Sequence, residues 1–590
     1  MLSNTNKELA RIFEEMGIIY EIKDDKFRSR AYHRAALTMD NFTNDTRDIY
    51  EKEGFSGLKK IPGIGEGLAS KIEEYIKTGH VKEYSELKKD IPVELEELTA
   101  VEGVGPKAVK AFYKELGVKN LKDLEAAAKA GHISELEGFG KTSEQNILQG
   151  ITFVKSNGGR KLLGDVLPYA ENLLQEIQKL PGVARSDLAG SIRRQQETIG
   201  DVDIIVASDN EKTVFNHVAK LPQVVKVLGR GDTKLSVHLQ SGIDIDVRVV
   251  AEESYGAALQ YFTGSKEHNV KVRQIAMSKG YKLNEYGLFK DKKNLASGVD
   301  ECDVYKKLGM QCPPPELRTD SGEIEASQIR KSRRKVGTPT EASGLPKLIE
   351  YGSIKGDLQI QTNWTDGKNT IEEYARRAKE MGFEYIAITD HTKALAMTGG
   401  LNEKRLLEHQ KEVREVDKKI KGIKVLSGVE CDILKDGSLD IDDEVLAQLD
   451  VVGVSVHSHF GLSRKEQTER VIKAISNPNA DIFFHPTGRR INKRAPIDID
   501  MEAVIKVAKK TGTIMEINAH PERLDLKDKH IRMAVEAGVR MCINTDAHSV
   551  DGLKYMDYGI AQARRGWAKP SDIVNTFSVN EFLGALKGGK

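Results

Sequence analysis

A chain of 590 residues is too long for a single hydrophobic core, so we expect three or four domains. With 39% apolar and 30% charged residues it has an ordinary globular composition, without a signal-peptide pattern or a run of about 18 apolar residues. The net charge of +1 gives no overall signal of nucleic-acid binding, and if nucleic acid is a partner the basic surface must be local. Four cysteines without a CxxC pair fit a reducing cytoplasm, and we expect no membrane partner.

Residues 1–155 carry apolar positions at helical spacing, interrupted by three glycine hairpins. In each, an apolar and a variable residue precede Gly-x-Gly and a further helical pattern; the glycines are Gly63 and Gly65, Gly103 and Gly105, and Gly138 and Gly140. Such glycines expose backbone N–H groups beside a helix N-terminus, which suits a DNA phosphate. Helix packing explains one hairpin equally well, but the repetition favours DNA binding. The pattern resembles the helix-hairpin-helix motif, which binds the DNA backbone without reading sequence.

Short β-like runs flanked by helical stretches make residues 156–317 an α/β or α+β region. Its sharpest signal is Gly200-Asp201-Val202-Asp203. Residues i and i+2 of a strand share a face, so Asp201 and Asp203 present adjacent carboxylates that favour a bound cation, above all Mg²⁺. A third carboxylate is expected from strand 243–248, where Asp244 and Asp246 face the same way.

A glycine-serine turn lies ten residues upstream of these carboxylates. The backbone N–H groups and hydroxyl of Gly190-Ser191 can cradle phosphates, while Arg194 neutralises their charge. An Asp-x-Asp pair alone is weak evidence, since many surface strands carry one. Joined to the turn and the later aspartate strand, it indicates a nucleotidyltransferase site.

The order of these motifs, followed by Tyr261-Phe262-Thr263-Gly264-Ser265, resembles family X DNA polymerases such as polymerase beta. The resemblance covers residues 1–317 and implies a lyase-like domain at 1–80, a fingers-like domain at 81–155, a palm at 156–252 and a thumb at 253–317. It implies Mg²⁺ or Mn²⁺ at Asp201, Asp203 and Asp246, with Asp246 nearest the primer 3′-hydroxyl. It further implies dNTP binding by Gly190, Ser191, Arg194, Tyr261, Phe262, Gly264 and Asn269, and base-pair or template contacts by Arg273.

A lyase site in the first hairpin is a further expectation from this resemblance. Lys71 matches the lysine that family members use to form a Schiff base with a deoxyribose-phosphate end, and Tyr32 resembles part of their pocket. That chemistry needs a neutral amine. However, Gly67 stands where polymerase beta has a phosphate-binding lysine, and a solvated helix lysine is the simpler interpretation of Lys71. We therefore expect weak lyase activity at most.

Residues 318–345, with a basic run at 329–335, indicate a linker, and residues 346–590 alternate apolar strands with helices. This alternation predicts a barrel-like β/α domain, in which the C-terminal strand ends gather on one rim. Metal-binding residue types follow five of these strands, which is hard to explain as structure alone. The layout resembles the polymerase-and-histidinol-phosphatase (PHP) domain. It implies phosphoester hydrolysis at bound Zn²⁺ or Mn²⁺ ions. The metal ligands that it implies are Asp366, His391, Glu430, His457, His485, Asp546 and His548.

The first PHP motif departs from the family pattern. It normally supplies His-x-His, but this chain has Gln359 and Gln361. A glutamine carbonyl is a poorer ligand for zinc or manganese than imidazole, so the metal position shared with Glu430 and Asp546 is expected to bind weakly or stay empty. We therefore predict that 3′–5′ exonuclease activity is reduced or lost.

The leading hypothesis is a monomeric, template-directed repair polymerase that fills short gaps, with gapped or primer-template DNA and dNTPs as partners. Two other enzyme functions stay open: a template-independent or small-molecule nucleotidyltransferase, and a protein in which the PHP domain is the main catalyst. A non-catalytic DNA-end scaffold is a further alternative, although it would not need three uncompensated carboxylates.

Overall fold

The computed structural model describes residues 4–41, 45–61, 63–101, 103–156, 159–291, 293–296, 300–328 and 344–586. Contacts between Cα atoms divide the chain into two compact units, residues 1–159 with 492–495, and residues 160–491 with 496–590. The basic run 329–335 lies outside the described residues. Among the helices that are described, none has both the length and the apolar character needed to cross a bilayer.

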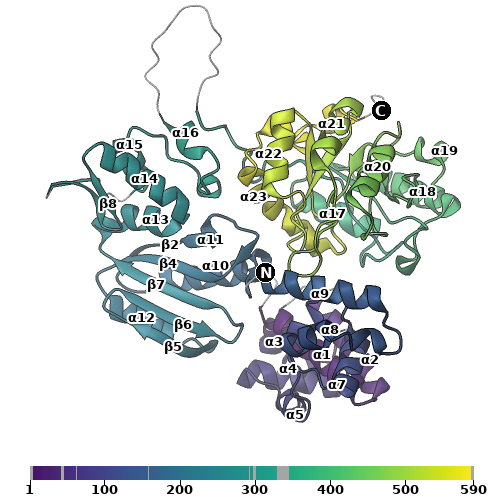
Figure 1. Ribbon diagram of the computed structural model, residues 1–590, viewed down its shortest axis with the longest axis horizontal. Coiled ribbons are helices and arrows are strands. Elements are labelled where there is room, and N and C mark those ends of the chain that lie inside the picture. The colour runs from purple at the N-terminus through teal and green to yellow at the C-terminus, as the bar shows by residue number, and fades with distance from the viewer. Residues whose placement is uncertain are drawn as a thin grey trace, which may run out of the picture. The chain divides into compact units, whose positions relative to one another are not determined.

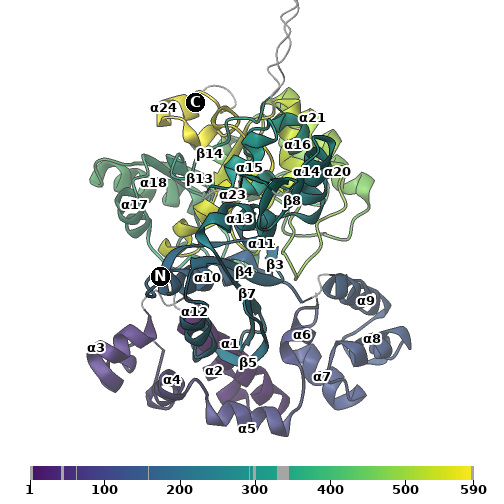
Figure 2. The same ribbon diagram turned by 90° about the vertical axis from the view of Figure 1, so that its left-hand side faces the viewer.

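Residues 4–156 of the first unit form helices around one apolar core (Figures 1 and 2). The helices are α1 Asn4–Ile22, α2 Lys26–Asn41, α3 Thr46–Leu58, α4 Glu66–Thr78, α5 Lys82–Asp90, α6 Leu95–Thr99, α7 Pro106–Leu116, α8 Leu121–Lys129 and α9 Lys141–Ser156. All three predicted hairpins are turns that lead into a helix. Their first glycines have φ of 77°, 83° and 86°, a region that glycine alone enters readily, at Gly63, Gly103 and Gly138. The second glycine directly precedes α4, α7 or α9.

The predicted palm begins the second unit with a five-stranded sheet of order β2-β4-β7-β6-β5. Its strands are β2 Val183–Leu188, β4 Asp201–Ser208, β5 Val224–Arg230, β6 Lys234–Leu239 and β7 Asp244–Val250; β1 Lys161–Leu162 pairs separately with β3 Thr198–Ile199. Its helices are α10 Leu163–Gln178, α11 Gly190–Arg193 and α12 Glu211–Ala219. Apolar side chains of α10 and α12 pack on one face of the sheet, against alternate strand residues such as Val202 and Ile245. The intervening residues, including Asp201 and Asp203, therefore lie on the other face.

The predicted thumb has its own small core. It contains α13 Tyr255–Thr263, α14 Lys266–Ser278, an antiparallel sheet of β8 Lys282–Asn284, β9 Gly287–Lys290 and β10 Lys293–Ala296, then α15 Cys302–Lys307. Helix α16 Glu323–Ser327 falls within the predicted linker 318–345, but Ile324 packs into the thumb core, so the start of that segment is folded and not a linker. Cys302 and Cys312, for which the sequence predicted no pairing, form a disulfide, whereas Cys431 and Cys542 are buried free thiols.

The C-terminal region is a nearly closed barrel of seven parallel strands in sequential order. The strands are β11 Gly356–Asp357, β12 Tyr385–Ile388, β13 Lys424–Asp432, β14 Val451–Ser455, β15 Ile482–Phe483, β16 Ile514–Asn518 and β17 Met541–Asn544. A parallel bridge between Ile360 and Ala547 joins the chain beyond the first and last strands. The surrounding helices are α17 Ile371–Glu380, α18 Glu403–Lys419, α19 Asp443–Leu446, α20 Arg464–Ile475, α21 Met501–Thr511, α22 Asp528–Ala537, α23 Met556–Arg565 and α24 Val579–Leu583.

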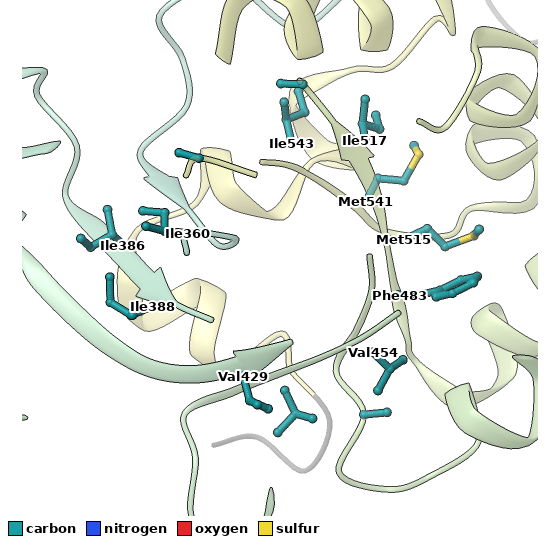
Figure 3. Close-up of a cluster of buried hydrophobic side chains, with 14 of the residues drawn as sticks. Ile360, Ile386, Ile388, Val429, Val454, Phe483, Met515, Ile517, Met541 and Ile543 are labelled. Carbon is teal, nitrogen blue, oxygen red and sulfur yellow. The ribbon is translucent and has the colours of Figure 1, made fainter. Parts of the chain in front are cut away.

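Two apolar layers hold this barrel. Side chains between strands and helices form the larger one. Figure 3 shows labelled members on successive strands, from Ile386 of β12 to Ile543 of β17, with Ile360 beyond the end of β11. The smaller layer uses the alternate strand residues, such as Leu426, together with Phe582 of α24. Glu430 is four residues after Leu426 on β13. It therefore lies on the same side of the strand and faces the barrel interior. The predicted barrel architecture is confirmed.

Candidate functional site

Two parallel palm strands bring the predicted carboxylates together. β4 and β7 pair so that Asp201 lies opposite Asp244 and Asp203 opposite Asp246. Asp244 is paired with His238, whose Nδ1 lies 2.6 Å from its Oδ1. Asp246 instead accepts a hydrogen bond of 2.6 Å from Ser236 Oγ, and its Oδ2 lies 2.6 Å from Lys234 Nζ.

The mutual repulsion of the carboxylates of Asp201, Asp203 and Asp246 favours a bound cation. Burial, then Asp201, then Asp246 raise the pKa of Asp203 to about 7. Because like charges disfavour ionisation of one another, the three carboxylates take up a proton unless a positive ion replaces it. Hard carboxylate oxygens are ligands that Mg²⁺ accepts, so the donor set fits a divalent ion held by Asp201, Asp203 and Asp246.

A pocket of about 500 Å³ opens beside the triad. It brings together residues from β4, α11, α13 and α14. Its lining contains ten predicted site residues, Gly190, Ser191, Arg194, Asp201, Asp203, Tyr261, Phe262, Gly264, Asn269 and Arg273, and four that the sequence did not single out, Arg160, Gln196, Ser265 and Lys266. Asp246 is not part of the lining. Arginine and lysine among the additional residues could have been suspected from charge alone, but only the fold places them here.

Unpartnered donors in this pocket suit a phosphate chain. Ser191 Oγ, Arg194 Nε and Gln196 Nε2 are buried and make no hydrogen bond within the described residues. Arg194 is oriented by donating through Nη1 to the carbonyl of Thr263. Since an unpaired buried donor carries a desolvation cost, these groups are best explained by a polar ligand such as a triphosphate.

Two aromatic residues of the pocket lining, Tyr261 and Phe262, are held by contacts with their neighbours. Tyr261 and Phe262 make an edge contact with ring centroids 5.1 Å apart, and the Arg248 guanidinium lies 4.2 Å from the Phe262 centroid. Asn269 donates to the carbonyl of Tyr261 at 2.7 Å and accepts from Gln260 at 2.9 Å. Fixed aromatic surface beside an oriented amide is suited to a sugar and base.

A buried ion triad joins the palm to the thumb. Arg193 binds Glu301 through two hydrogen bonds of 2.8 and 2.6 Å and also donates to Thr263 at 2.6 Å. Fully buried Arg318 donates to Glu301 at 2.8 Å. Burial by itself would raise the pKa of Glu301, but Arg318 and Arg193 hold it at about 2. The triad thus fixes the two domains on either side of the pocket.

In the first unit, the predicted lyase residues share one partner. Lys71 Nζ lies 2.8 Å from Glu83 Oε2 and donates to the carbonyl of Gly67 at 3.3 Å. Tyr32 donates to Glu83 at 3.2 Å. These contacts occupy the Lys71 amine that Schiff-base chemistry would use.

All nine predicted PHP positions lie around the C-terminal ends of the barrel strands. Glu430 is the centre of the group: His457 Nε2 and His485 Nε2 lie 3.2 and 2.8 Å from its Oε1, and His391 Nδ1 lies 3.6 Å from its Oε2. Two sets could hold a metal ion, Asp366 with His391 and His548, and His391 with Glu430 and His457. His391 Nδ1 is buried without a hydrogen bond among the described residues, as expected of a ligand nitrogen.

The two glutamines fill a third position with hydrogen bonds. Gln359 and Gln361 are fully buried and donate through Nε2 to Glu430 Oε2 at 3.1 and 2.6 Å. Asn518 donates both to Gln359 Oε1 at 3.1 Å and to Asp546 Oδ2 at 3.2 Å. Amide groups therefore stand between the carboxylates of Glu430 and Asp546, where the family pattern has imidazoles.

Two residues of this rim were missed by the sequence analysis. Asn518 ends β16, and Arg523 in the following loop places Nε 3.1 Å from Asp546 Oδ2. Polar residues at the end of β16 converge on the same rim as those of the other barrel strands. Neither an amide nor a guanidinium is an ordinary metal ligand, so the sequence around β16 carries no metal-binding pattern.

Comparisons with known proteins agree with this arrangement. Family models match the helix-hairpin-helix domain at residues 4–81, the SAM-like helix-hairpin-helix tandem at 95–151, the DNA polymerase beta thumb at 258–319 and the PHP domain at 357–544.

Individual relatives match the same regions. The DNA polymerase/3′-5′ exonuclease PolX of Bacillus subtilis (strain 168) is 36% identical over 585 residues, 98% of this chain and 99% of that protein. DNA polymerase lambda of Arabidopsis thaliana is 27% identical over 48% of this chain and 54% of its own length, and that of Rattus norvegicus is 23% identical over 54% and 56%. The chain therefore belongs to the family X DNA polymerases that carry a C-terminal PHP domain.

Proposed function

We propose that this chain is a template-directed DNA polymerase that fills short gaps in DNA repair. The observation that carries the proposal is the Asp201, Asp203 and Asp246 triad beside a pocket with unpartnered phosphate-binding donors. We further propose that it works as a monomer on gapped or primer-template DNA in the cytoplasm. Three Gly-x-Gly turns at the starts of α4, α7 and α9 support non-specific binding to the DNA backbone.

The residues divide the work of nucleotidyl transfer. Divalent ions, Mg²⁺ or Mn²⁺, would supply activation of the primer 3′-oxygen and charge neutralisation at the phosphates. Asp246 is held by Ser236 and Lys234 in the position proposed nearest the 3′-hydroxyl. Ser191 and Arg194 bind and orient the triphosphate.

The remaining pocket residues select and align the nucleotide. Tyr261 and Phe262 form the floor under the sugar, and Asn269 presents its amide beside them. Arg273 also lines the pocket and is proposed to contact the base pair or template.

Extension of a one-nucleotide-gapped duplex with Mg²⁺ tests this proposal. Templated incorporation that Asp201→Ala and Asp203→Ala abolish supports it. Incorporation without regard to template favours a template-independent transferase, and gap binding without incorporation favours a scaffold. A labelled primer followed without dNTPs reports nuclease activity in the same experiment, and degradation without extension would make the PHP domain the main catalyst.

We also propose that the PHP domain has a weakened or lost 3′–5′ exonuclease. The supporting observation is the amide network of Gln359, Gln361 and Asn518 between Glu430 and Asp546. Hydrogen-bond donors stabilise both carboxylates without a cation, and glutamine is a poor replacement for an imidazole ligand. The two remaining sets are proposed to retain Zn²⁺ or Mn²⁺ through His391, Glu430 and their neighbours.

Restoring the imidazoles tests the exonuclease proposal. Gln359→His with Gln361→His should add metal to the purified protein, measured by elemental analysis, and raise Mn²⁺-dependent degradation at least about tenfold. The same pair combined with His391→Ala is the control and should lose the gain. Full nuclease activity in the unmodified protein would contradict the proposal.

Lyase activity is proposed to be weak. Lys71 Nζ is occupied by contacts with Glu83 and with the carbonyl of Gly67, and Gly67 stands where polymerase beta has a phosphate-binding lysine. Borohydride trapping on a 5′-deoxyribose-phosphate end measures Schiff-base formation directly. Trapping that Lys71→Ala removes, at the level of a proficient lyase, would contradict this expectation.

A further inference from the structure

The segment that follows the Gly190-Ser191 turn has two different sides. Arg194 and Gln196 line the nucleotide pocket. The alternate residues, Gln195 and Glu197, are bound by side chains of the PHP domain in the same compact unit. One short stretch of backbone therefore carries nucleotide-binding residues on one side and interdomain contacts on the other.

The contact at Glu197 is a buried, bidentate ion pair. Arg489, in the loop after β15, donates through Nη1 and Nη2 to the two carboxylate oxygens at 3.0 and 2.7 Å. Gln562 of α23 adds a hydrogen bond of 2.8 Å to Oε1. The exposed fractions of the Glu197 and Arg489 side chains are only 12% and 10%. Paired geometry of this kind fixes orientation as well as distance.

A second contact holds the backbone itself. Arg565, also on α23, donates through Nη1 to the carbonyl of Gln195 at 3.1 Å. Gln195 has φ of 52°, a conformation that a residue with a side chain rarely keeps unless its surroundings impose it. This constraint lies directly between Arg194 and Gln196.

Packing around these contacts is close. Gly164 of α10 lies against Pro521 so tightly that a Cβ would be 2.5 Å from the proline Cβ, and Tyr558 of α23 packs against the palm core. Although burial alone would raise the pKa of Glu197, Arg489 holds it at about 2, so the carboxylate stays ionised in the interface.

We infer that Arg489, Gln562 and Arg565 of the PHP domain are positioning residues of the polymerase: they hold segment 194–197 so that Arg194 and Gln196 meet the incoming dNTP. The inference rests on the proposed polymerase function. None of the three residues belongs to the predicted metal-ligand set, so this role does not depend on nuclease activity.

Nucleotide binding without chemistry tests the inference. The full-length protein is bound to a one-nucleotide gap with a dideoxy-terminated primer and 2-aminopurine beside the templating base, and dNTP is titrated with Mg²⁺. Arg489→Met should weaken dNTP binding about tenfold while leaving gapped-DNA affinity within about twofold, because the change misplaces phosphate-binding groups only. Arg489→Lys should recover part of the loss, and Arg376→Met, which removes an exposed ion pair on α17, should change nothing.

The possible results distinguish a failure of this positioning role from a failure of the proposed polymerase function. Unchanged dNTP affinity in folded Arg489→Met, or equal losses of dNTP and DNA affinity, would overturn the positioning role. If Arg489→Met does not fold, Gln562→Met decides, since it keeps the ion pair: a loss of about threefold in dNTP affinity supports the inference, and an unchanged value overturns it. A wild-type protein that binds gapped DNA but no dNTP would instead refute the proposed polymerase function.

Discussion

Gly190 leaves no room for a side chain beside the proposed catalytic carboxylate of Asp203, and Gly190→Ala is the perturbation that best tests the site. The residue has φ of 59°, and a Cβ there would overlap Oδ2 of Asp203 and lie 3.3 Å from its Cγ. An alanine in this backbone region costs about 1 kcal/mol. Asp203 has a short side chain, so it can relieve the overlap only by swinging its carboxylate away from Asp201 and Asp246.

The expected effects on stability and catalysis are therefore unequal. A cost of about 1 kcal/mol lowers the Tm of a domain of about 100 residues, the size of the predicted palm, by about 4–8 °C. Misplacing a catalytic group by about 1 Å lowers the rate on the order of 100-fold. Gly190→Ala should thus fill a one-nucleotide gap about 100 times more slowly in single-turnover assays while remaining folded.

Gly229→Ala in β5 is the matched control. Gly229 lies in the sheet that carries Asp203, outside the left-handed region, and an added Cβ meets no atom within 4 Å. It should leave the gap-filling rate unchanged. A Gly190→Ala protein with a rate within about threefold of the wild type, or an equal loss in Gly229→Ala, would refute the proposed geometry of Asp203.

Two further predictions concern charge. Glu301→Gln leaves Arg193 and Arg318 without their buried counter-ion, so it should lower the free energy of unfolding, measured in urea, by about 3–5 kcal/mol. A loss under about 1 kcal/mol would mean that the Arg193–Glu301–Arg318 group contributes little to stability. Because the folded pKa of Asp203 is raised to about 7, its contribution to stability is complete below its usual pKa near 4 and disappears as pH rises through 7. In EDTA, the Tm should therefore fall more steeply from pH 5 to pH 8 in the wild type than in Asp203→Asn, and Mg²⁺ should remove this difference; parallel pH profiles would contradict it.

Strand periodicity predicted where the palm carboxylates lie but not how they differ. It placed Asp201 and Asp203 on one face, because side chains of a strand alternate. The same rule put Asp244 and Asp246 on a common face and could not choose between them. In the structure the two aspartates differ in their partners on the neighbouring strand β6: His238 contacts Asp244, whereas Ser236 and Lys234 contact Asp246. Pairing between strands is a property of the sheet and not of either segment.

For the PHP domain, repeated strand-helix alternation was sufficient to predict the barrel and the rim where the ligands gather. It did not reveal that Asn518 and Arg523 join the glutamines, since these contacts connect strand ends far apart in the chain. The Glu197 contact was equally invisible, because Arg489 lies 292 residues away and neither residue belongs to a recognised motif. Long-range pairing of common charged residues leaves no local pattern.

The glutamine pair and the Glu197 contact bear on each other. If the PHP domain acted only as a nuclease, the loss of two imidazole ligands would leave no functional requirement for its buried arginines, Arg489 and Arg565, to bind the palm. Instead, breaking the pair of Glu197 with Arg489 would leave an uncompensated charge in an interface that also holds Gln195, and such losses are more damaging than the pair is stabilising. Substitutions at Gln359 and Gln361 leave α23 and the loop after β15 in place, so we expect them to be tolerable for polymerase function. Substitutions at Arg489 are not, so we expect the two parts of the domain to differ sharply in how mutation affects gap filling.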